Sequence, residues 1–300
     1  MHVHTHEMRG MHRALGWALG ANLAFVGVEF VAGTLAHSLA LITDAVHNLS
    51  DLPSMSLSLV ALYAQSRPAD TRRTYGYQRS GVLAAFVNAL ILLAVAAFIF
   101  YKAYQRFRAP VAVETNLMLW VSLVGIGVNG GIAWGMWRGR RDVNLRTVLI
   151  HNAGDAASNF GILVGALVIA QTRWYVIDPV ISVAIGLAIL WSAWGVLKET
   201  TNILLEGTPP GLEVERVARA LLTVEGVTEV HDVHIWSLAS HQHALSCHVR
   251  VQEMTTRDTG KILAQLNGLL ARRFDIHHTT IQFETDAAPA PIPSFPVMGQ

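Results

Sequence analysis

"SGVLAAFVNALILLAVAAFIFYKAY" occupies residues 80–104 and contains no charged residue before Lys102. An apolar run of about 20 residues is long enough to cross a hydrocarbon core of roughly 30 Å as an α-helix. Barrel strands would be about half as long and would alternate in polarity, so the run predicts a membrane-spanning helix. The 300 residues are 52% hydrophobic and 14% charged, which favours a membrane protein over a soluble one.

Further apolar runs of similar length complete a set of six expected spans, joined by short connections. The fold class is therefore an α-helical membrane protein with six transmembrane helices. The spans are expected near residues 13–33, 38–63, 80–104, 115–137, 147–171 and 175–197.

Basic residues in the connections indicate the orientation of the spans, because cytoplasmic loops are rich in Lys and Arg. The connections after the second and fourth spans carry Arg67, Arg72, Arg73, Arg79, Arg138, Arg140, Arg141 and Arg146. Both are expected in the cytoplasm, and an even number of spans then places both termini there. Lys102, Arg106 and Arg108 run against this rule. The sequence shows no secretory leader, which fits the inner membrane of a bacterium.

The composition changes at Pro209, Pro210 and Gly211, which predict the end of the last long helix. The periodicity that follows predicts a small α+β domain with the order α-β-β-α-β. Cys247 is the single cysteine, which excludes an intramolecular disulfide. Four regions are expected: a His-containing cytoplasmic tail at 1–12, a six-helix transmembrane domain at 13–206, a cytoplasmic domain at 207–286 and a disordered tail at 287–300.

A repeated motif lies inside two of the expected spans: "HNLSD" at His47–Asp51 and "HNAGD" at His151–Asp155. Residues four apart lie on one face of a helix, so each motif presents an imidazole beside a carboxylate. Two such pairs supply four N and O ligands, which suit a tetrahedral divalent ion, zinc above all. Two carboxylates also balance the charge of that ion within the bilayer. The alternative is that neighbouring polar groups satisfy both carboxylates.

Other polar residues accompany the motifs. Asp44 lies on the same helical face as His47 and is a possible auxiliary ligand. Asn48 and Asn152 are interpreted as helix-packing residues, and the roles of Glu29 and Asp178 stay open. The N-terminal histidines form either a solvated tail or a metal-gathering cluster: His2, His4, His6 and His12.

Several stretches together carry a resemblance to a known family. They are "HSLALITDAVHNLSDLPSMSLSLVALYAQSRPADTRRTYGYQRSGVLAAFVNAL", "LIHNAGDAASNFGILVGALV", "IDPVISVAIGLAIL", "VHDVHIWSL" and "HALSCHV", in this order. The sequence resembles the cation diffusion facilitators, close to their bacterial and vesicular zinc-transporter branch. The resemblance implies a transport site of His47, Asp51, His151 and Asp155, with Zn²⁺ as the first substrate. It also implies a homodimer that exchanges metal for protons.

The resemblance extends to the C-terminal domain, which is similar to a ferredoxin-like metallochaperone fold. Strand periodicity places two histidines on adjacent strands of one hairpin. The regulatory zinc ligands that the resemblance implies are His231, His248, His277 and Glu284. The alternative is that these are ordinary surface histidines.

The loop between the second and third spans departs from some family members. Those members hold a metal there with an Asp and two His, whereas this sequence has Asp70, Arg73 and Tyr77 at the matching places, so we expect no metal site in the loop. Arg79 resembles a basic residue that stabilises the family's dimer, and Glu199 or Glu206 is its expected partner.

The sequence therefore predicts a divalent metal efflux transporter that works by metal/proton antiport and alternating access. Zn²⁺ is expected as substrate and regulatory ligand, with protons as counter-substrate. The expected partners are metal ions, membrane lipid and a second copy of the chain, and nothing points to nucleic acid. A membrane zinc enzyme is disfavoured because hydrolytic zinc has three protein ligands and an open position. A zinc sensor that signals through the C-terminal domain would not need ligands at the bilayer centre.

Overall fold

The computed structural model describes residues 20, 23–49, 69–137, 143–239 and 242–285. The chain divides into two compact units, one of residues 1–56 with 87–195 and the other of residues 57–86 with 196–300.

Four of the described helices are long and apolar enough to span a membrane. They are α3 (Ser80–Arg108), α4 (Thr115–Met136), α5 (Val143–Thr172) and α6 (Ile177–Leu204). They confirm the last four expected spans, although α6 continues past the expected end at residue 197. Two shorter helical segments precede them, Leu23–Leu35 and residues 39–49. The first two expected spans lie partly outside the described residues, so the count of six stays a prediction.

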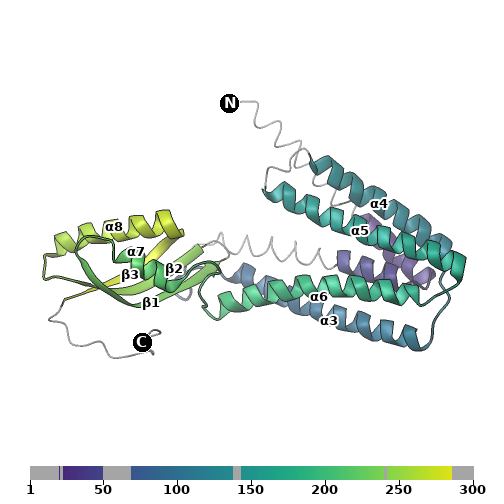
Figure 1. Ribbon diagram of the computed structural model, residues 1–300, viewed down its shortest axis with the longest axis horizontal. Helices are drawn as coiled ribbons and strands as arrows, with labels where there is room; N and C mark the ends of the chain where they lie inside the picture. The colour runs from purple at the N-terminus through teal and green to yellow at the C-terminus, as the bar shows by residue number, and fades with distance from the viewer. Residues whose placement is uncertain (1–19, 21–22, 50–68, 138–142, 240–241, 286–300) are drawn as a thin grey trace, which may run out of the picture. The chain divides into compact units, whose positions relative to one another are not determined.

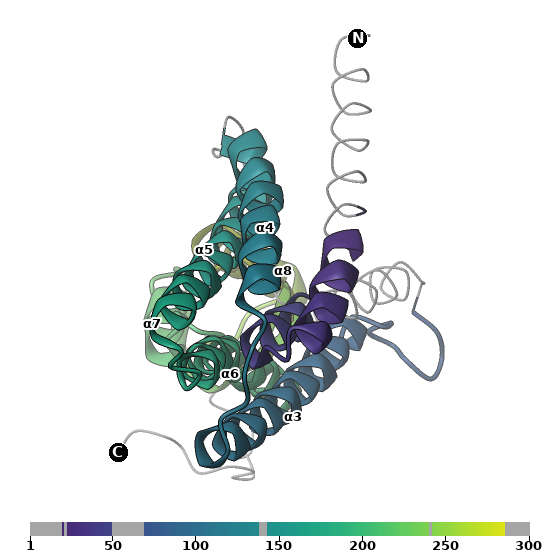
Figure 2. The same cartoon turned by 90° about the vertical axis from the view of Figure 1, so that its right-hand side faces the viewer.

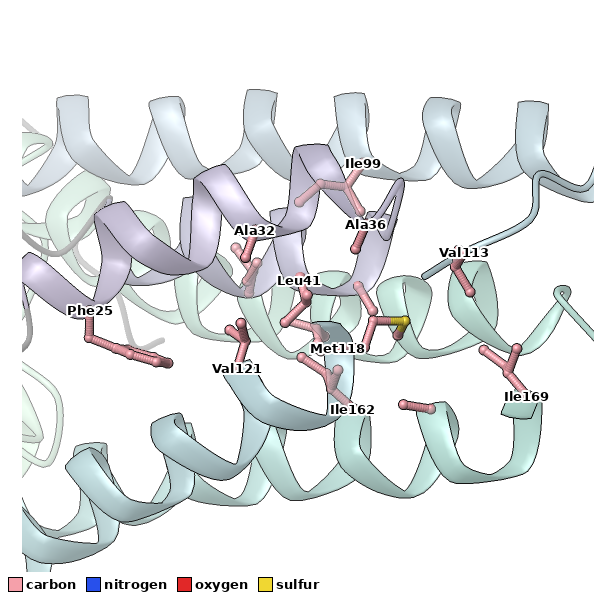
Figure 3. Close-up of a cluster of buried hydrophobic side chains, with 14 of the residues drawn as sticks. Phe25, Ala32, Ala36, Leu41, Ile99, Val113, Met118, Val121, Ile162 and Ile169 are labelled. Atoms are coloured by element: carbon pink, nitrogen blue, oxygen red, sulfur yellow. The ribbon is translucent and has the colours of Figure 1, made fainter. Parts of the chain in front are cut away.

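The membrane helices pack around a cluster of small and branched apolar side chains. Helices α4 and α5 run side by side in both views (Figure 1, Figure 2). Leu41, Met118 and Ile162 are fully buried and lie between the helices (Figure 3). Lipid tails are as apolar as these side chains, so close packing and polar contacts must decide which helix faces meet.

Asp178, at the start of α6, is a fully buried carboxylate with several donors. Ser38 Oγ donates to Oδ1 at 2.6 Å, and the backbone N–H groups of Leu39 and Ala40 donate at 2.7 and 3.2 Å. These N–H groups open the helix at residues 39–49 and have no partner within it. Arg106 Nη1 lies 3.7 Å from Oδ2 and neutralises the charge. Asp178 therefore caps one helix from the end of another.

The C-terminal domain has the predicted order α-β-β-α-β. Its elements are α7 (Val214–Leu221), β1 (Val227–Ala239), β2 (Gln242–Val251), α8 (Thr256–Phe274) and β3 (Ile276–Glu284). The three strands form one sheet in the order β1-β2-β3. β1 pairs with β2 antiparallel, and β2 pairs with β3 parallel. Helix α8 makes the crossover that a parallel pair requires (Figure 1).

Local signals fix the ends of α8. The hydroxyl of Thr255 accepts the N–H of Asp258, which is an N-terminal cap. Asp275 follows the helix with a φ of 55°, and its N–H bonds to the Leu270 carbonyl. The helix buries Leu266 and Leu270, which pack in one core with Leu245, Cys247 and Val249 of β2. Alternation along β2 leaves its other side chains on the opposite face of the sheet.

Cys247 offers a test of this core. Burial raises the pKa of its thiol to about 12. The thiolate is the reactive species, so we expect negligible alkylation by iodoacetamide at pH 8 in the folded protein and full alkylation in guanidinium. Mass spectrometry counts the label, and Glu253→Cys, at an exposed position, is the positive control. Rapid labelling of Cys247 without denaturant would contradict the described packing.

Candidate metal sites

His151 and Asp155 lie one turn apart on α5. His151 Nε2 is 3.4 Å from Asp155 Oδ2, and the two side chains are 40% and 4% exposed. Their predicted position on one helical face is therefore confirmed. The pair offers one imidazole and one carboxylate from within a membrane-spanning helix.

The other motif is only partly described. His47 lies in the helix at residues 39–49 and is half-buried, whereas Asp51 lies outside the described residues. Within the described part of the chain, His47, His151 and Asp155 do not form a set whose ligand atoms all lie within 4.8 Å of one another. The structure thus places three of the four predicted ligands in two neighbouring helices without gathering them into a closed site.

A hydrogen-bonded side chain connects these two helices next to the motifs. Asn159 Nδ2 donates to Asp44 Oδ2 at 2.9 Å and to the Asp155 carbonyl at 3.2 Å. Asp44 lies one turn before His47, and Asn159 lies one turn after Asp155. The contact therefore joins the two helices about one turn from His47 and about one turn from Asp155. Sequence reasoning missed Asn159, because nothing in its neighbourhood in the sequence distinguishes it from a packing residue.

Glu29 belongs to the same polar cluster and is fully buried. Asn48 Nδ2 donates to Glu29 Oε2 at 3.4 Å. Asn48 packs as expected, and its amide holds Glu29.

A second group of potential ligands lies on the C-terminal sheet. His231, His248 and Glu284 place one ligand atom each within 4.8 Å of one another. His231 Nε2 is 3.2 Å from one Glu284 oxygen, and His248 Nδ1 is 3.0 Å from the other. Neither approach has hydrogen-bond geometry, so in the described structure both nitrogens are buried without a hydrogen-bond partner. Two imidazoles and a carboxylate that converge in this way are a ligand set that a divalent cation such as zinc accepts.

The strands explain this convergence. His231 pairs directly with His248 across β1 and β2, and their ring centroids are 5.4 Å apart, which confirms the predicted hairpin. The register of β1 shifts between His231 and His234, where Asp232 has a φ of 49°. The shift brings Asp232 Oδ2 to 3.7 Å from His248 Nε2. Asp232 therefore adds a carboxylate beside the His248 ring, a neighbour that sequence reasoning missed.

The fourth predicted regulatory ligand lies elsewhere. His277 is at the start of β3, whereas Glu284 is at its end. The His277 Nε2 atom lies 2.8 Å from Asp275 Oδ1, and the His277 side chain is 69% exposed. Within one chain, the structure does not bring His277 to the cluster.

The loop before α3 holds the three residues at the places of a family metal site. The backbone N–H groups of Arg72 and Arg73 both donate to Asp70 Oδ1 at 2.7 Å, which holds the pKa of Asp70 below its usual value. The Arg73 guanidinium lies 4.6 Å from the centre of the Tyr77 ring and donates to its hydroxyl. All three side chains are thus engaged, and the absence of a loop metal site stays a prediction.

Arg79 forms the expected ion pair. Its Nη2 lies 3.1 Å from Glu206 Oε1, so Glu206 rather than Glu199 is the partner in the structure. Both side chains are partly exposed, which limits the stability that the pair contributes.

The chain matches two family descriptions. Residues 17–205 match the cation efflux transmembrane domain, and residues 209–286 match the cytoplasmic domain of cation efflux proteins. The chain belongs to the cation efflux family, also called the cation diffusion facilitators, as the motifs predicted. It is therefore a multi-pass membrane transporter and not an enzyme.

Similar proteins of known name cover nearly the whole chain. The cation efflux system protein CzcD of Alcaligenes sp. (strain CT14) is 37% identical over 94% of this chain and 89% of its own length. The cadmium, cobalt and zinc/H⁺-K⁺ antiporter of Bacillus subtilis (strain 168) is 36% identical, over 87% and 85%. The zinc transporter ZitB of Escherichia coli (strain K12) is 34% identical, over 94% and 92%.

One solved structure is similar to part of the chain. It is the metal-bound C-terminal domain of the CzcD transporter from Cupriavidus metallidurans. It is 37% identical and covers 24% of this chain and 99% of its own, with a TM-score of 0.23.

The placement of His277 can be tested by zinc titration of the purified full-length protein. We expect His248→Ala to lose about one bound equivalent of Zn²⁺, because it removes a converging ligand from the sheet. His277→Ala should keep the wild-type stoichiometry, since its side chain faces Asp275. Equal losses in the two variants would show that His277 reaches the cluster from a second copy of the chain.

Proposed function

We propose that this transporter exports divalent metal, Zn²⁺ first, in exchange for protons. The proposed transport site consists of His47, Asp51, His151 and Asp155. The observation that carries this proposal is the His151–Asp155 pair, which places a buried carboxylate beside an imidazole inside a membrane helix. Ionisable groups at such positions are rare and mark ion pathways.

The chemistry of the four ligands suits transient binding of zinc. Two carboxylates neutralise the two charges of the ion, so the loaded site carries no net charge into the bilayer. Imidazole and carboxylate donors are ones that zinc accepts in a tetrahedral arrangement. The antiporter of Bacillus subtilis is named for cadmium, cobalt and zinc, which supports a divalent substrate but leaves the preference among the three ions open.

Proton exchange follows from the same ligands. Only neutral imidazole binds zinc, so protons compete with the metal for His47 and His151. A site that opens to one side at a time converts this competition into antiport, because protons displace the metal on the more acidic side. The similarity to a zinc/H⁺-K⁺ antiporter supports this coupling.

We also propose an oligomeric state and a membrane location for the transporter. The chain acts as a homodimer in a bacterial cell membrane, with both termini in the cytoplasm. The orientation rests on the Arg-rich connections. The Arg79–Glu206 pair lies within the second compact unit, and we assign it a role in dimer stability.

The cluster on the C-terminal sheet is proposed as a regulatory metal site. Its ligands are His231, His248 and Glu284, which leave one tetrahedral position for water or for a residue of the second copy. Metal at this position would tighten the dimer of C-terminal domains and thereby change the balance between states of the membrane domain.

The transport site is tested by Zn²⁺ uptake into proteoliposomes with an imposed pH gradient. We expect Asp155→Ala and Asp51→Ala to lower uptake by more than the roughly 10- to 100-fold cost of losing an outer-shell partner, because each removes a ligand. Glu199→Gln, an exposed carboxylate on α6, is the matched control and should keep wild-type uptake. Wild-type rates in Asp155→Ala would exclude the proposed site.

Proton coupling is tested by the pH dependence of metal binding. Because protonated imidazole cannot bind metal, Zn²⁺ affinity should fall as the pH drops from about 7.5 to about 5.5. Calorimetry in two buffers of different ionisation enthalpy counts the protons released per metal, and His248→Ala removes the contribution of the sheet cluster. An affinity that stays the same over this range would contradict coupling through histidine.

A further inference from the structure

Asn159 is a fully buried amide that joins two membrane helices. Its Nδ2 group donates to Asp44 Oδ2, from the helix at residues 39–49, and to the Asp155 carbonyl of its own helix. Both amide protons are thus used. The cross-helix bond is 2.9 Å long, and its acceptor is a buried carboxyl group, which makes it a strong contact in an apolar medium.

The position of this bond relates directly to the proposed transport site. Asp44 lies three residues before His47, and Asn159 lies four residues after Asp155, so each partner lies about one turn from a proposed ligand. Any slide or rotation of one helix against the other would break this bond. The bond therefore sets the separation between the helix with His47 and the helix with Asp155.

Helix α4 provides the space that Asn159 occupies. A Cβ atom built on Gly125 would lie 2.2 Å from Asn159 Oδ1 and 2.6 Å from its Cγ. Such distances cannot occur, so a side chain at this position would displace the amide. Gly127, two residues further along the same helix, has no atom within 4 Å of its built Cβ. The Asn159 side chain therefore requires a glycine at position 125.

The first helical segment, Leu23–Leu35, contacts the same group of residues. Asn48, one turn after Asp44, donates to Glu29 of this segment at 3.4 Å. Phe25 of that segment also lies 2.7 Å from the Cβ built on Gly125, and its ring points into the helix cluster in Figure 3.

We propose that Asn159, seated against Gly125 and bonded to Asp44, is a positioning residue that sets the spacing of the transport site for Zn²⁺. This inference rests on the proposed function. It assigns no metal contact to Asn159. It gives Asp44 the role of an acceptor that holds the two helices in register.

The test uses full-length protein in proteoliposomes and measures the KM and maximal rate for Zn²⁺ and for the larger ion Cd²⁺. Asn159→Ala removes the bond, and Gly125→Ala displaces the amide without touching a ligand. We expect each to raise the KM for Zn²⁺ by about 10- to 100-fold, as the loss of an outer-shell partner does. The KM for Cd²⁺ should change less, because a looser site accommodates a larger ion. Gly127→Ala is the matched control and should behave as wild type.

Asn159→Ser separates the two bonds of the amide. A serine hydroxyl in a helix bonds back to the carbonyl four residues earlier, so this variant keeps the bond to Asp155 and loses the bond to Asp44. It should match Asn159→Ala in KM. If Asn159→Ala does not fold, Asn159→Ser and Gly125→Ala decide the question, with thermal unfolding in detergent as the check on folding.

The positioning role of Asn159 and the proposed transport site are overturned by different results. A folded Asn159 variant with wild-type KM for Zn²⁺, or a Gly127→Ala variant as impaired as Gly125→Ala, overturns the positioning role. Equal losses for Zn²⁺ and Cd²⁺ confined to the maximal rate also overturn it. The transport site itself fails only if Asp155→Ala transports as wild type does, which is measured in the same vesicles.

Discussion

A carboxylate inside a membrane domain needs donors, because water is not there to supply them. Asp178 shows how this constraint organises the helices. Its carboxylate accepts two backbone N–H groups and the Ser38 hydroxyl at the start of the helix at residues 39–49, while Arg106 supplies the opposite charge. The beginning of one helix is thereby fixed to the beginning of α6. Apolar packing alone would leave that position open, since side chains and lipid are equally apolar.

A second polar contact completes the placement of this helix. Asp44 lies five residues after Leu39, which is a rise of about 7.5 Å at 1.5 Å per residue. It binds Asn159 of α5, so the helix is held at two heights by two different helices. Two fixed points on a rigid rod determine both its height and its rotation. His47 lies one turn further along the same helix, so these two bonds also fix the position of its backbone.

The spans and the C-terminal elements could be predicted because each leaves a local pattern. Hydropathy over about 20 residues marks a span, and period-two alternation placed His231 and His248 on adjacent strands of one hairpin, where the structure pairs them directly. The contacts of Asp178, Asn159 and Arg106 could not be predicted, since their partners lie far away in the chain and no periodicity links them. Arg106 is also an exception to the rule that Lys and Arg are enriched in cytoplasmic loops. Its bonds to Asp178 and the His37 carbonyl give it a structural reason to be there.

The C-terminal sheet differs from the membrane helices, because it can bury apolar surface against its own helices. Leu245, Cys247 and Val249 face α7 and α8 and supply the core. The period of two then places His248 on the other face, where His231 and Glu284 meet it from the neighbouring strands. Ligands on this face can be exchanged without opening the core. In the membrane helices, by contrast, the Asn159–Asp44 bond lies about one turn from the proposed ligands, so ligand binding and helix packing cannot change independently there.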